Sequence, residues 1–166
     1  MSTTGSRFLH LLRHAKAEQA AVAATRAVDH ARTLTPRGRD DATAMGDWMR
    51  ANGLRPDLAL VSSAMRTAET YALLRLPAGP RLVTSEALYL ADLDQLVRTL
   101  RAQSEARSIL LVGHNPGLHE LALHLAPHSR ALQTGLPTCT LASFELAADW
   151  AALGPAHAEL SAIHRP

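Results

Sequence analysis

Short apolar runs alternate along this chain with segments whose apolar residues recur at helical spacing, and this alternation strongly restricts the possible fold. The expected strands are Phe8–Arg13, Leu58–Val61, Arg81–Val83, Ile109–Val112, Cys139–Leu146 and Glu159–Ile163. The expected helices are Asp40–Asn52, Ala64–Leu76, Asp92–Gln103 and Pro116–Ala126. Strands that alternate with helices predict an α/β fold. We expect a three-layer sandwich, with a mostly parallel central sheet and helices on both faces.

Details of the pattern refine this expectation. Ile109–Val112 is apolar at every position, which indicates a central strand that is buried on both faces. No crossover helix is evident after Leu136, so we expect an antiparallel strand there, at the edge of the sheet. Thr35 and Pro36 suit the N-cap and the first position of a helix. The alanine-rich segment Ala20–Ala31 is either a helix or a mobile loop that faces the substrate.

Length and composition limit the class of protein. The 166 residues, 47% of them hydrophobic, suit one domain, which we expect over residues 8–166 after a flexible N-terminus over residues 1–7. The sequence has no apolar stretch of the ~20 residues that span a membrane, and its polar start does not resemble a signal peptide. We therefore expect a cytoplasmic protein with no membrane partner. The net charge of +2 is too small to indicate nucleic-acid binding.

The cysteine and histidine content indicates no disulfide and no metal. Cys139 is the single cysteine and lies in an apolar run, so we expect a buried thiol without a catalytic role. His119 and His124 are five positions apart, whereas the helical zinc motif needs a spacing of four. At that spacing the two rings diverge by roughly 140° around a helix. We expect neither a metal nor a cofactor.

Charged or imidazole side chains follow three of the expected strands where each strand ends. Arg13 and His14 follow the first strand. Arg66 falls in the first turn of a helix that a preceding serine can cap. His114 follows the continuously apolar strand and precedes Asn115, an expected helix N-cap before a proline in the first helical position. Taken singly, Arg13-His14 is more often a solvated strand exit and Arg66 is more often a surface arginine, whereas His114 is as readily a histidine satisfied in the core.

A parallel sheet changes that interpretation, because it brings the carboxyl ends of its strands to one edge, where ligands bind in open α/β folds. Arg13, His14, Arg66 and His114 would then share one site. Guanidinium groups and helix N-termini favour phosphate oxygens, and neutral imidazole is a nucleophile near neutral pH. The residues therefore predict a site that binds a phosphoryl group and attacks it in line.

Four segments resemble motifs of the histidine phosphatase (phosphoglycerate mutase-like) superfamily. Leu11–Ala15 resembles its Arg-His-Gly signature, with alanine in place of the usual glycine. Ser62–Thr70 resembles its second phosphate-binding segment, and Val112–Gly117 resembles its second histidine motif. Asp29–Gly38 is similar to a segment typical of the short SixA-like phosphohistidine phosphatase branch. The resemblance extends from the first strand to the C-terminus and implies a phosphoglycerate mutase-like fold.

The resemblance also implies a role for each catalytic residue. His14 would be the nucleophile that forms a phosphohistidine intermediate, which water then hydrolyses. Arg13 and Arg66 would hold the phosphoryl oxygens. His114 would donate a hydrogen bond to the phosphoryl group as charge develops. Such a set needs no metal.

Other residues near this site are expected to contribute less directly. Glu86 lies near the place where larger members carry a general acid, and it is either that acid or a solvated glutamate. Ser62 and Asn115 are expected to contact the substrate. Further polar residues near the entrance, expected to touch substrate without being catalytic, are Lys16, Asp29 and Arg32.

The resemblance implies a metal-independent phosphatase that acts on a phosphorylated protein or a small phosphate. A compact chain without large insertions favours a phosphohistidine side chain presented by another protein. One alternative is a small-molecule phosphomonoesterase or mutase of the same fold. An alternative from another class is a non-catalytic phosphate-binding module, although binding alone would not require the nucleophile His14.

Overall fold

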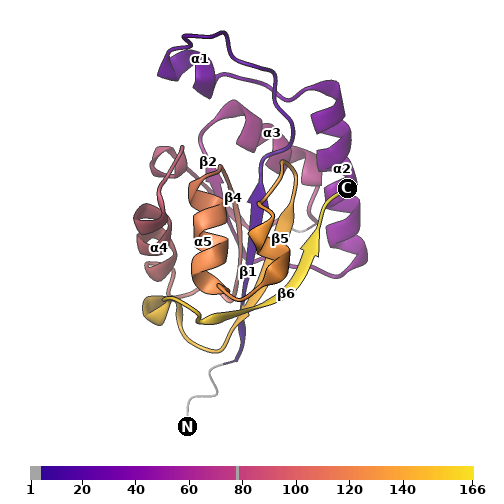
Figure 1. Ribbon diagram of the computed structural model, residues 1–166. Coiled ribbons are helices and arrows are strands. Elements are labelled where there is room, and N and C mark those ends of the chain that lie inside the picture. The colour runs from indigo at the N-terminus through magenta and orange to yellow at the C-terminus, as the bar shows by residue number, and fades with distance from the viewer. Residues whose placement is uncertain (1–4, 78) are drawn as a thin grey trace.

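The computed structural model describes residues 5–77 and 79–166, which form one six-stranded sheet with helices on both faces (Figure 1). The strands are β1 (Arg7–Arg13), β2 (Leu58–Ser62), β3 (Arg81–Ser85), β4 (Ser108–Gly113), β5 (Leu141–Leu146) and β6 (Ala158–His164). The α-helices are α1 (Arg26–His30), α2 (Pro36–Ala51), α3 (Met65–Leu74), α4 (Leu93–Arg101), α5 (Gly117–Leu125) and α6 (Arg130–Gln133). The 3-10 helices are η1 (Glu86–Leu88) and η2 (Trp150–Ala152). The predicted α/β architecture is confirmed.

The strand order is β3-β2-β4-β1-β5-β6. Strands β3, β2, β4 and β1 pair in parallel. Strand β5 pairs antiparallel with β1, and β6 pairs antiparallel with β5 at the edge. Ile109–Val112 lies in β4 between two strands, with each side chain 0% exposed. The central strand is therefore where the sequence predicts it. The predicted antiparallel edge strand is β6, and a second antiparallel strand, β5, lies between β6 and β1.

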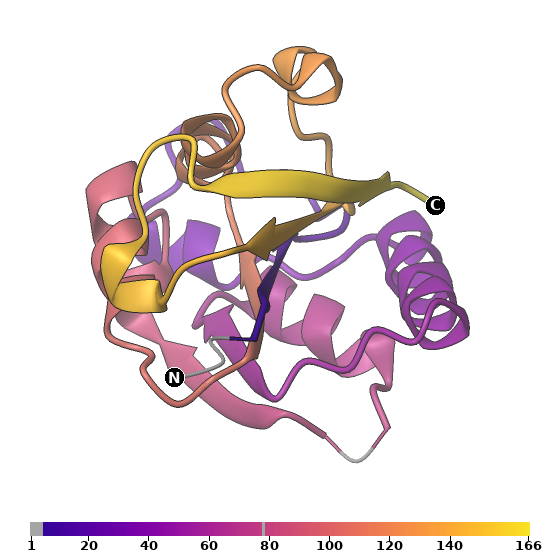
Figure 2. The same ribbon diagram turned by 90° about the horizontal axis from the view of Figure 1, so that it is seen from below.

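The sheet separates two apolar cores. Helices α4, α5 and α6 lie against one face, and α2 and α3 lie against the other (Figures 1 and 2). Successive residues of β1 point to opposite cores, with Leu9 and Leu11 on the α4–α5 side and Leu12 on the α2–α3 side. A strand buried on both faces is apolar at nearly every position, which explains why these runs are not alternating.

Helix α2 begins at the predicted cap. The Thr35 side chain accepts a hydrogen bond from Gly38 N–H at 3.0 Å, and Pro36 is the first helical residue. Further along α2, Gly46 allows a close approach to α3, because a Cβ at this position would lie 2.2 Å from the Leu74 carbonyl oxygen. This contact sets the separation of the two helices that lie beneath the site.

Helix α3 differs from the expected capping. It begins at Met65 with Ala64 at the N-cap, and no side-chain hydrogen bond caps it. The expected serine cap was wrong because the two preceding hydroxyl groups bond elsewhere. The Ser62 hydroxyl bonds to His114, and the Ser63 hydroxyl bonds to Glu86.

Helix α5 also begins differently. Its first residue is Gly117, and Pro116 occupies the N-cap position without a side-chain cap. Asn115 is not the N-cap: its amide Nδ2 donates to the Leu136 carbonyl at 2.9 Å, and its Oδ1 accepts no hydrogen bond from a described residue. The side chain is thereby tied to the loop that precedes β5.

Two other expected segments can be placed. Residues 1–4 of the expected flexible N-terminus lie outside the described residues, and Arg7 already belongs to β1. The Ala20–Ala31 segment contains the short helix α1, in which no residue is buried. Within the ranges that the structure describes, no helix has the length and apolar character needed to cross a bilayer.

Candidate active site

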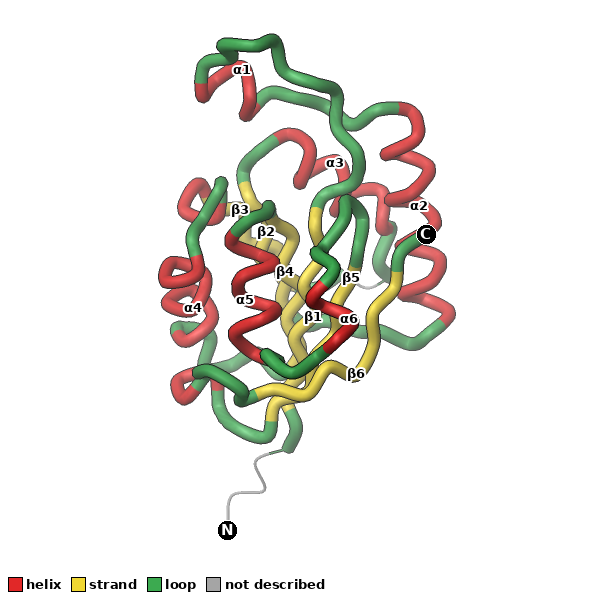
Figure 3. Tube along the Cα trace, viewed as in Figure 1, coloured by secondary structure: helices red, strands yellow, loops and turns green. Residues whose placement is uncertain are grey.

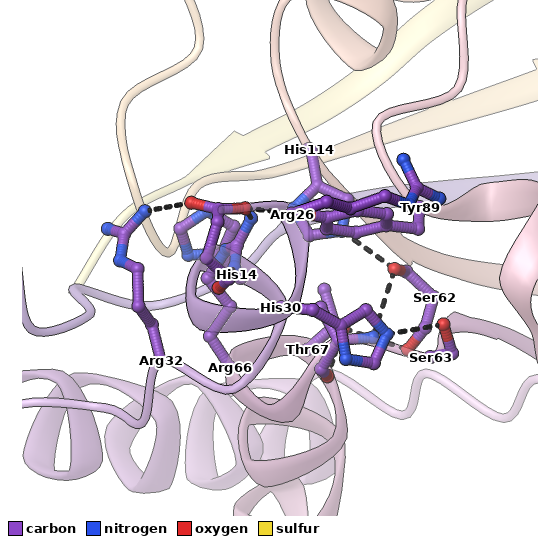
Figure 4. A network of polar contacts seen from close by, with 12 residues as sticks. His14, Arg26, His30, Arg32, Ser62, Ser63, Arg66, Thr67, Tyr89 and His114 are labelled. Carbon is purple, nitrogen blue, oxygen red and sulfur yellow. Dashed lines mark hydrogen bonds and ion pairs between the residues drawn. The ribbon is translucent and has the colours of Figure 1, made fainter. Parts of the chain in front are cut away.

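Four residues singled out in the sequence meet at the carboxyl edge of the sheet. Arg13 ends β1 and His14 follows it, Arg66 lies in the first turn of α3, and His114 follows β4. The ends of these elements adjoin because β2, β4 and β1 are neighbours in the sheet. All four side chains line one pocket of about 430 Å³, and Figure 4 shows three of them together.

His14 is held in one tautomer. Its Nδ1 lies 2.7 Å from the carbonyl oxygen of Ala15, and a carbonyl only accepts, so Nδ1 carries the proton and donates it. In the neutral ring, Nε2 then has a free lone pair. Burial lowers the pKa of His14 to about 4, the Ala15 hydrogen bond partly opposes this, and the charges of Arg66 and Arg13 add to the lowering. The neutral, nucleophilic form therefore dominates near neutral pH.

The backbone around His14 is fixed to two other elements. The His14 N–H donates to the Gly113 carbonyl at 3.1 Å, which ties the turn after β1 to β4. The Ala15 N–H donates to Thr70 Oγ1 at 3.0 Å, and that hydroxyl donates to the Arg66 carbonyl at 2.7 Å. Thr70 thus connects the turn that carries His14 to the helix that carries Arg66. Sequence analysis did not predict this role, although Thr70 lies within the Ser62–Thr70 motif.

The two arginines keep donors available for a ligand. Arg13 donates from Nη1 to the Leu136 carbonyl at 3.0 Å, and Arg66 donates from Nη1 to the Asp29 carbonyl at 2.8 Å. Among the described residues, neither Nε has a hydrogen-bond partner, although both atoms are buried. A guanidinium group has five N–H donors, so each arginine can still bind oxygens of a phosphoryl group.

His114 is held in the opposite tautomer. Its Nε2 lies 2.7 Å from Ser62 Oγ, which itself accepts the Ala64 N–H at 3.4 Å. Among the described residues, Nε2 is the one acceptor bonded to this hydroxyl, so the hydroxyl donates its hydrogen to Nε2 and the ring proton is on Nδ1, a buried atom that has no partner there. Burial, and then the charges of Arg66 and His14, lower the pKa of His114 to about 3. His114 can therefore donate one N–H from a neutral ring, 5.4 Å from the His14 ring centre.

The two expected substrate contacts occupy different places. Asn115 lines the pocket, and its Oδ1 is buried without a partner within the described ranges. Ser62 is 0% exposed and lies beside His114, to which its hydroxyl is hydrogen-bonded (Figure 4). Ser62 therefore reaches the pocket only through His114, so its position suits orienting that ring.

Glu86 lies beside the site and faces helix α1. Its carboxylate accepts the Ser63 hydroxyl and Arg26 Nη2, the latter at 2.8 Å, and it lies 3.4 Å from His30 Nε2. Arg26, His30 and Glu86 line a separate hollow, and Glu86 is not among the described residues that line the pocket of His14. The hydrogen bonds from Ser63 and Arg26 lower the pKa of Glu86. The side chain is thus an ionised carboxylate that helps to hold α1.

Tyr89, for which sequence analysis predicted no role, contacts both α1 and His114 (Figure 4). Its hydroxyl donates to Asp29 Oδ2. Its ring is edge-on to His114 at 5.6 Å and to His30 at 4.9 Å, and Arg26 lies over it at 4.3 Å. In the sequence, the one feature that could have indicated this position near the site is that Tyr89 follows shortly after Glu86.

His119 and Cys139, which lie outside the pocket, are held by contacts within the fold. In the described part of the chain, no group of three or more His, Cys, Asp or Glu residues could hold a metal ion. His119 Nε2 donates to the Leu132 carbonyl at 2.7 Å. Cys139 is 1% exposed, and burial raises the pKa of its thiol to about 12. The prediction of a buried thiol is confirmed.

Comparisons with known proteins agree with this geometry. No family model matches the chain. An uncharacterized protein of Mycobacterium leprae is 33% identical over 162 residues, which cover 93% of this chain and 99% of that protein. A Nakamurella multipartitia structure assigned as a SixA phosphohistidine phosphatase gives a TM-score of 0.84 at 30% identity, covering 98% of this chain and 97% of the other. An Agrobacterium tumefaciens protein assigned likewise gives 0.83 at 29% identity, covering 96% and 98%.

The α/β fold, with two arginines and two histidines at the strand ends, defines the protein as a phosphatase of the histidine-dependent class. The chain belongs to the histidine phosphatase superfamily, and its fold is phosphoglycerate mutase-like. The resemblance that the sequence motifs indicated is confirmed.

Proposed function

We propose that the protein hydrolyses phosphohistidine on a protein substrate, through a phosphoryl intermediate on His14. The state of His14 carries the proposal. Its ring is buried and neutral, its Nδ1–H is donated to Ala15, and Nε2 is left free in a pocket with two guanidinium groups. The similarity to a SixA phosphohistidine phosphatase at 30% identity supports the choice of substrate.

In the first step, Nε2 of His14 attacks phosphorus in line with the bond to the leaving nitrogen. The new N–P bond forms as the substrate N–P bond breaks, and the leaving ring takes the electron pair. Arg13, Arg66 and the Nδ1–H of His114 stabilise the charge on the phosphoryl oxygens. A substrate ring protonated at its other nitrogen departs as neutral imidazole, so this step needs no proton from the protein.

In the second step, water attacks the phosphorus of phospho-His14. The bond to Nε2 breaks, His14 returns to its neutral form with Nδ1–H intact, and both water hydrogens leave with the phosphate as H₂PO₄⁻. Donor and acceptor in the first step are both imidazole, so the phosphoryl transfer is chemically almost symmetrical. This symmetry suits a site in which the nearby carboxyl groups, Glu86 and Asp29, both have a lowered pKa and are ionised.

The proposal extends to partner and compartment. The substrate is a phosphorylated side chain of another protein, and the reaction takes place in the cytoplasm, which keeps thiols such as Cys139 reduced. A small-molecule phosphomonoesterase or mutase of the same fold is not favoured, and neither is a non-catalytic binding module. A module would not need a histidine held with Nε2 free.

Trapping of the phosphoenzyme tests this proposal. The enzyme is mixed with a protein carrying radiolabelled phosphohistidine, quenched in alkali to preserve N–P bonds, and mapped by mass spectrometry. We expect label on His14 in the wild type and in a His128→Ala control, whose altered side chain is exposed and outside the site. We expect neither label nor turnover in His14→Ala. Turnover by His14→Ala, or label on a different residue, would overturn the proposal.

A further inference from the structure

The chain between β1 and α2 rises over the carboxyl edge of the sheet and carries α1 there (Figures 1 and 3). The two ends of this segment are hydrogen-bonded to each other: Thr35 N–H donates to the Lys16 carbonyl and Glu18 N–H donates to the Thr33 carbonyl, each at 2.9 Å. None of the α1 residues is buried. Helix α1 is therefore held over the site by polar contacts rather than by an apolar core.

Asp29 makes most of these contacts on the side of the pocket. Oδ1 accepts from Arg32 Nη1 at 2.8 Å, while Oδ2 accepts from Arg66 Nη2 at 3.2 Å and from the Tyr89 hydroxyl. An ionised carboxylate offers about four acceptor positions, and these three donors leave about one open on Oδ1. The Asp29 side chain is 25% exposed and lines the pocket of His14, so a ligand in this pocket can approach the carboxylate.

The charge of Asp29 is exceptional in this pocket. Asp29 is the one acidic residue among the described residues that line it. The cationic residues that line the same pocket are Arg13, Lys16, Arg32 and Arg66. Burial alone would raise the pKa of Asp29, but the hydrogen bonds of Tyr89 and Arg32 and the charge of Arg66 outweigh burial and hold that pKa well below its usual range. Asp29 is therefore negatively charged near neutral pH.

We propose that Asp29 is a specificity-determining residue that binds the positively charged ring of the leaving group and so favours phosphohistidine over phosphate esters. This inference rests on the proposed function. The four cations attract the phosphoryl group of any substrate, but they repel a leaving group that is itself a cation. A protonated phosphohistidine ring carries such a charge, and its free N–H can donate to the open position on Oδ1. An aryl phosphate has neither the charge nor the donor.

A substitution that removes the charge of Asp29 but keeps the shape of its side chain tests the inference. For Asp29→Asn, we expect kcat/KM for a phosphohistidine peptide to fall about tenfold further than kcat/KM for p-nitrophenyl phosphate, which is the effect of one charge-assisted hydrogen bond to the leaving group. For Arg32→Gln, we expect kcat/KM for the phosphohistidine peptide to rise relative to kcat/KM for p-nitrophenyl phosphate, because Arg32 partly neutralises Asp29. The two variants thus displace the substrate preference in opposite directions.

Asp47→Asn is the matched control. Asp47 also pairs with an arginine three positions further on, Arg50, but it is 69% exposed and lies on α2, so the ratio should not change. An equal loss on both substrates in Asp29→Asn would overturn the inference and assign Asp29 only to positioning of Arg66. An unchanged ratio would also overturn it. If the wild type labels His14 and Asp29→Asn keeps its ratio, the inference fails while the proposed function stands. If the wild type labels no histidine, the proposed function itself fails.

Discussion

The Ser62 hydroxyl donates to Nε2 of His114 across 2.7 Å and thereby decides which nitrogen of His114 faces a ligand with its proton. Ser62 ends β2, and His114 follows the neighbouring strand β4. Ser62 is completely buried, yet through this hydrogen bond it determines which N–H of His114 can donate.

Loss of the Ser62 hydroxyl is expected to reduce the rate of phosphoryl transfer. In Ser62→Ala, the proton of His114 can move to Nε2, which removes the Nδ1–H donor that we propose stabilises charge in the transition state. We expect kcat to fall about tenfold to hundredfold with little change in KM, as for other groups that act in the transition state. Steady-state kinetics on a phosphohistidine peptide measures this. In the control Ser63→Ala the altered hydroxyl contacts Glu86 and His30 instead, so kcat should be retained. An equal loss in both variants would contradict the assigned role.

Removal of the Glu86 charge is expected to leave catalysis nearly intact. Glu86 is largely exposed, pairs with Arg26 and is absent from the described lining of the His14 pocket. In Glu86→Gln, we expect both phosphohistidine and aryl phosphate hydrolysis to change by no more than about twofold, the scale of an exposed ion pair. Parallel kinetics on the two substrates checks this. A selective loss of aryl phosphate hydrolysis would instead identify Glu86 as the general acid.

Acid is expected to destabilise the fold through His10. Burial lowers the pKa of His10 from 6.5 to about 4, while Nδ1 lies 2.8 Å from Ser143 Oγ. As pH falls through this window, the unfolded chain takes up the proton first, so stability is present above the upper value and is lost towards the lower one. His10 alone should cost about 2 kcal/mol between about pH 7 and pH 5. Urea unfolding of the wild type and of His10→Gln at both pH values measures the difference. A variant that loses stability as steeply as the wild type would contradict this account.

A methyl group at Gly46 is expected to separate α2 from α3. Alanine normally stabilises a helix by about 1 kcal/mol relative to glycine, but here its Cβ would lie 2.2 Å from the Leu74 carbonyl oxygen, a backbone atom that cannot rotate away. We expect Gly46→Ala to lower the free energy of unfolding by about 2 kcal/mol, as overpacking does elsewhere. Thermal and urea unfolding measure the change. Ala44→Gly, at an exposed position on the same helix, gives the propensity effect alone. An increase in stability of Gly46→Ala would refute the close contact.

Much of the fold is predictable from local patterns. The continuous apolar run Ile109–Val112 indicates a strand buried on both faces, and it is the central parallel strand. Thr35 caps α2 as its chemistry predicts. The caps of α3 and α5 were not predictable, because Ser62 and Asn115 satisfy partners far along the chain, His114 and Leu136. A capping propensity describes only how well a side chain bonds to the nearby helix N–H groups. It does not include hydrogen-bond partners far away in the sequence that compete for the same side chain.

The sequence by itself determined that Arg13, His14, Arg66 and His114 follow strand ends, and a parallel sheet necessarily brings such ends to one edge. The tertiary structure alone decided the state of each group. Whether an imidazole carries its proton on Nδ1 or Nε2, and whether a carboxylate faces the pocket, depends on partners separated by many residues. Asp29 is 37 positions from Arg66 and 60 from Tyr89, so their contact is a property of the folded chain, where burial makes each hydrogen bond decisive.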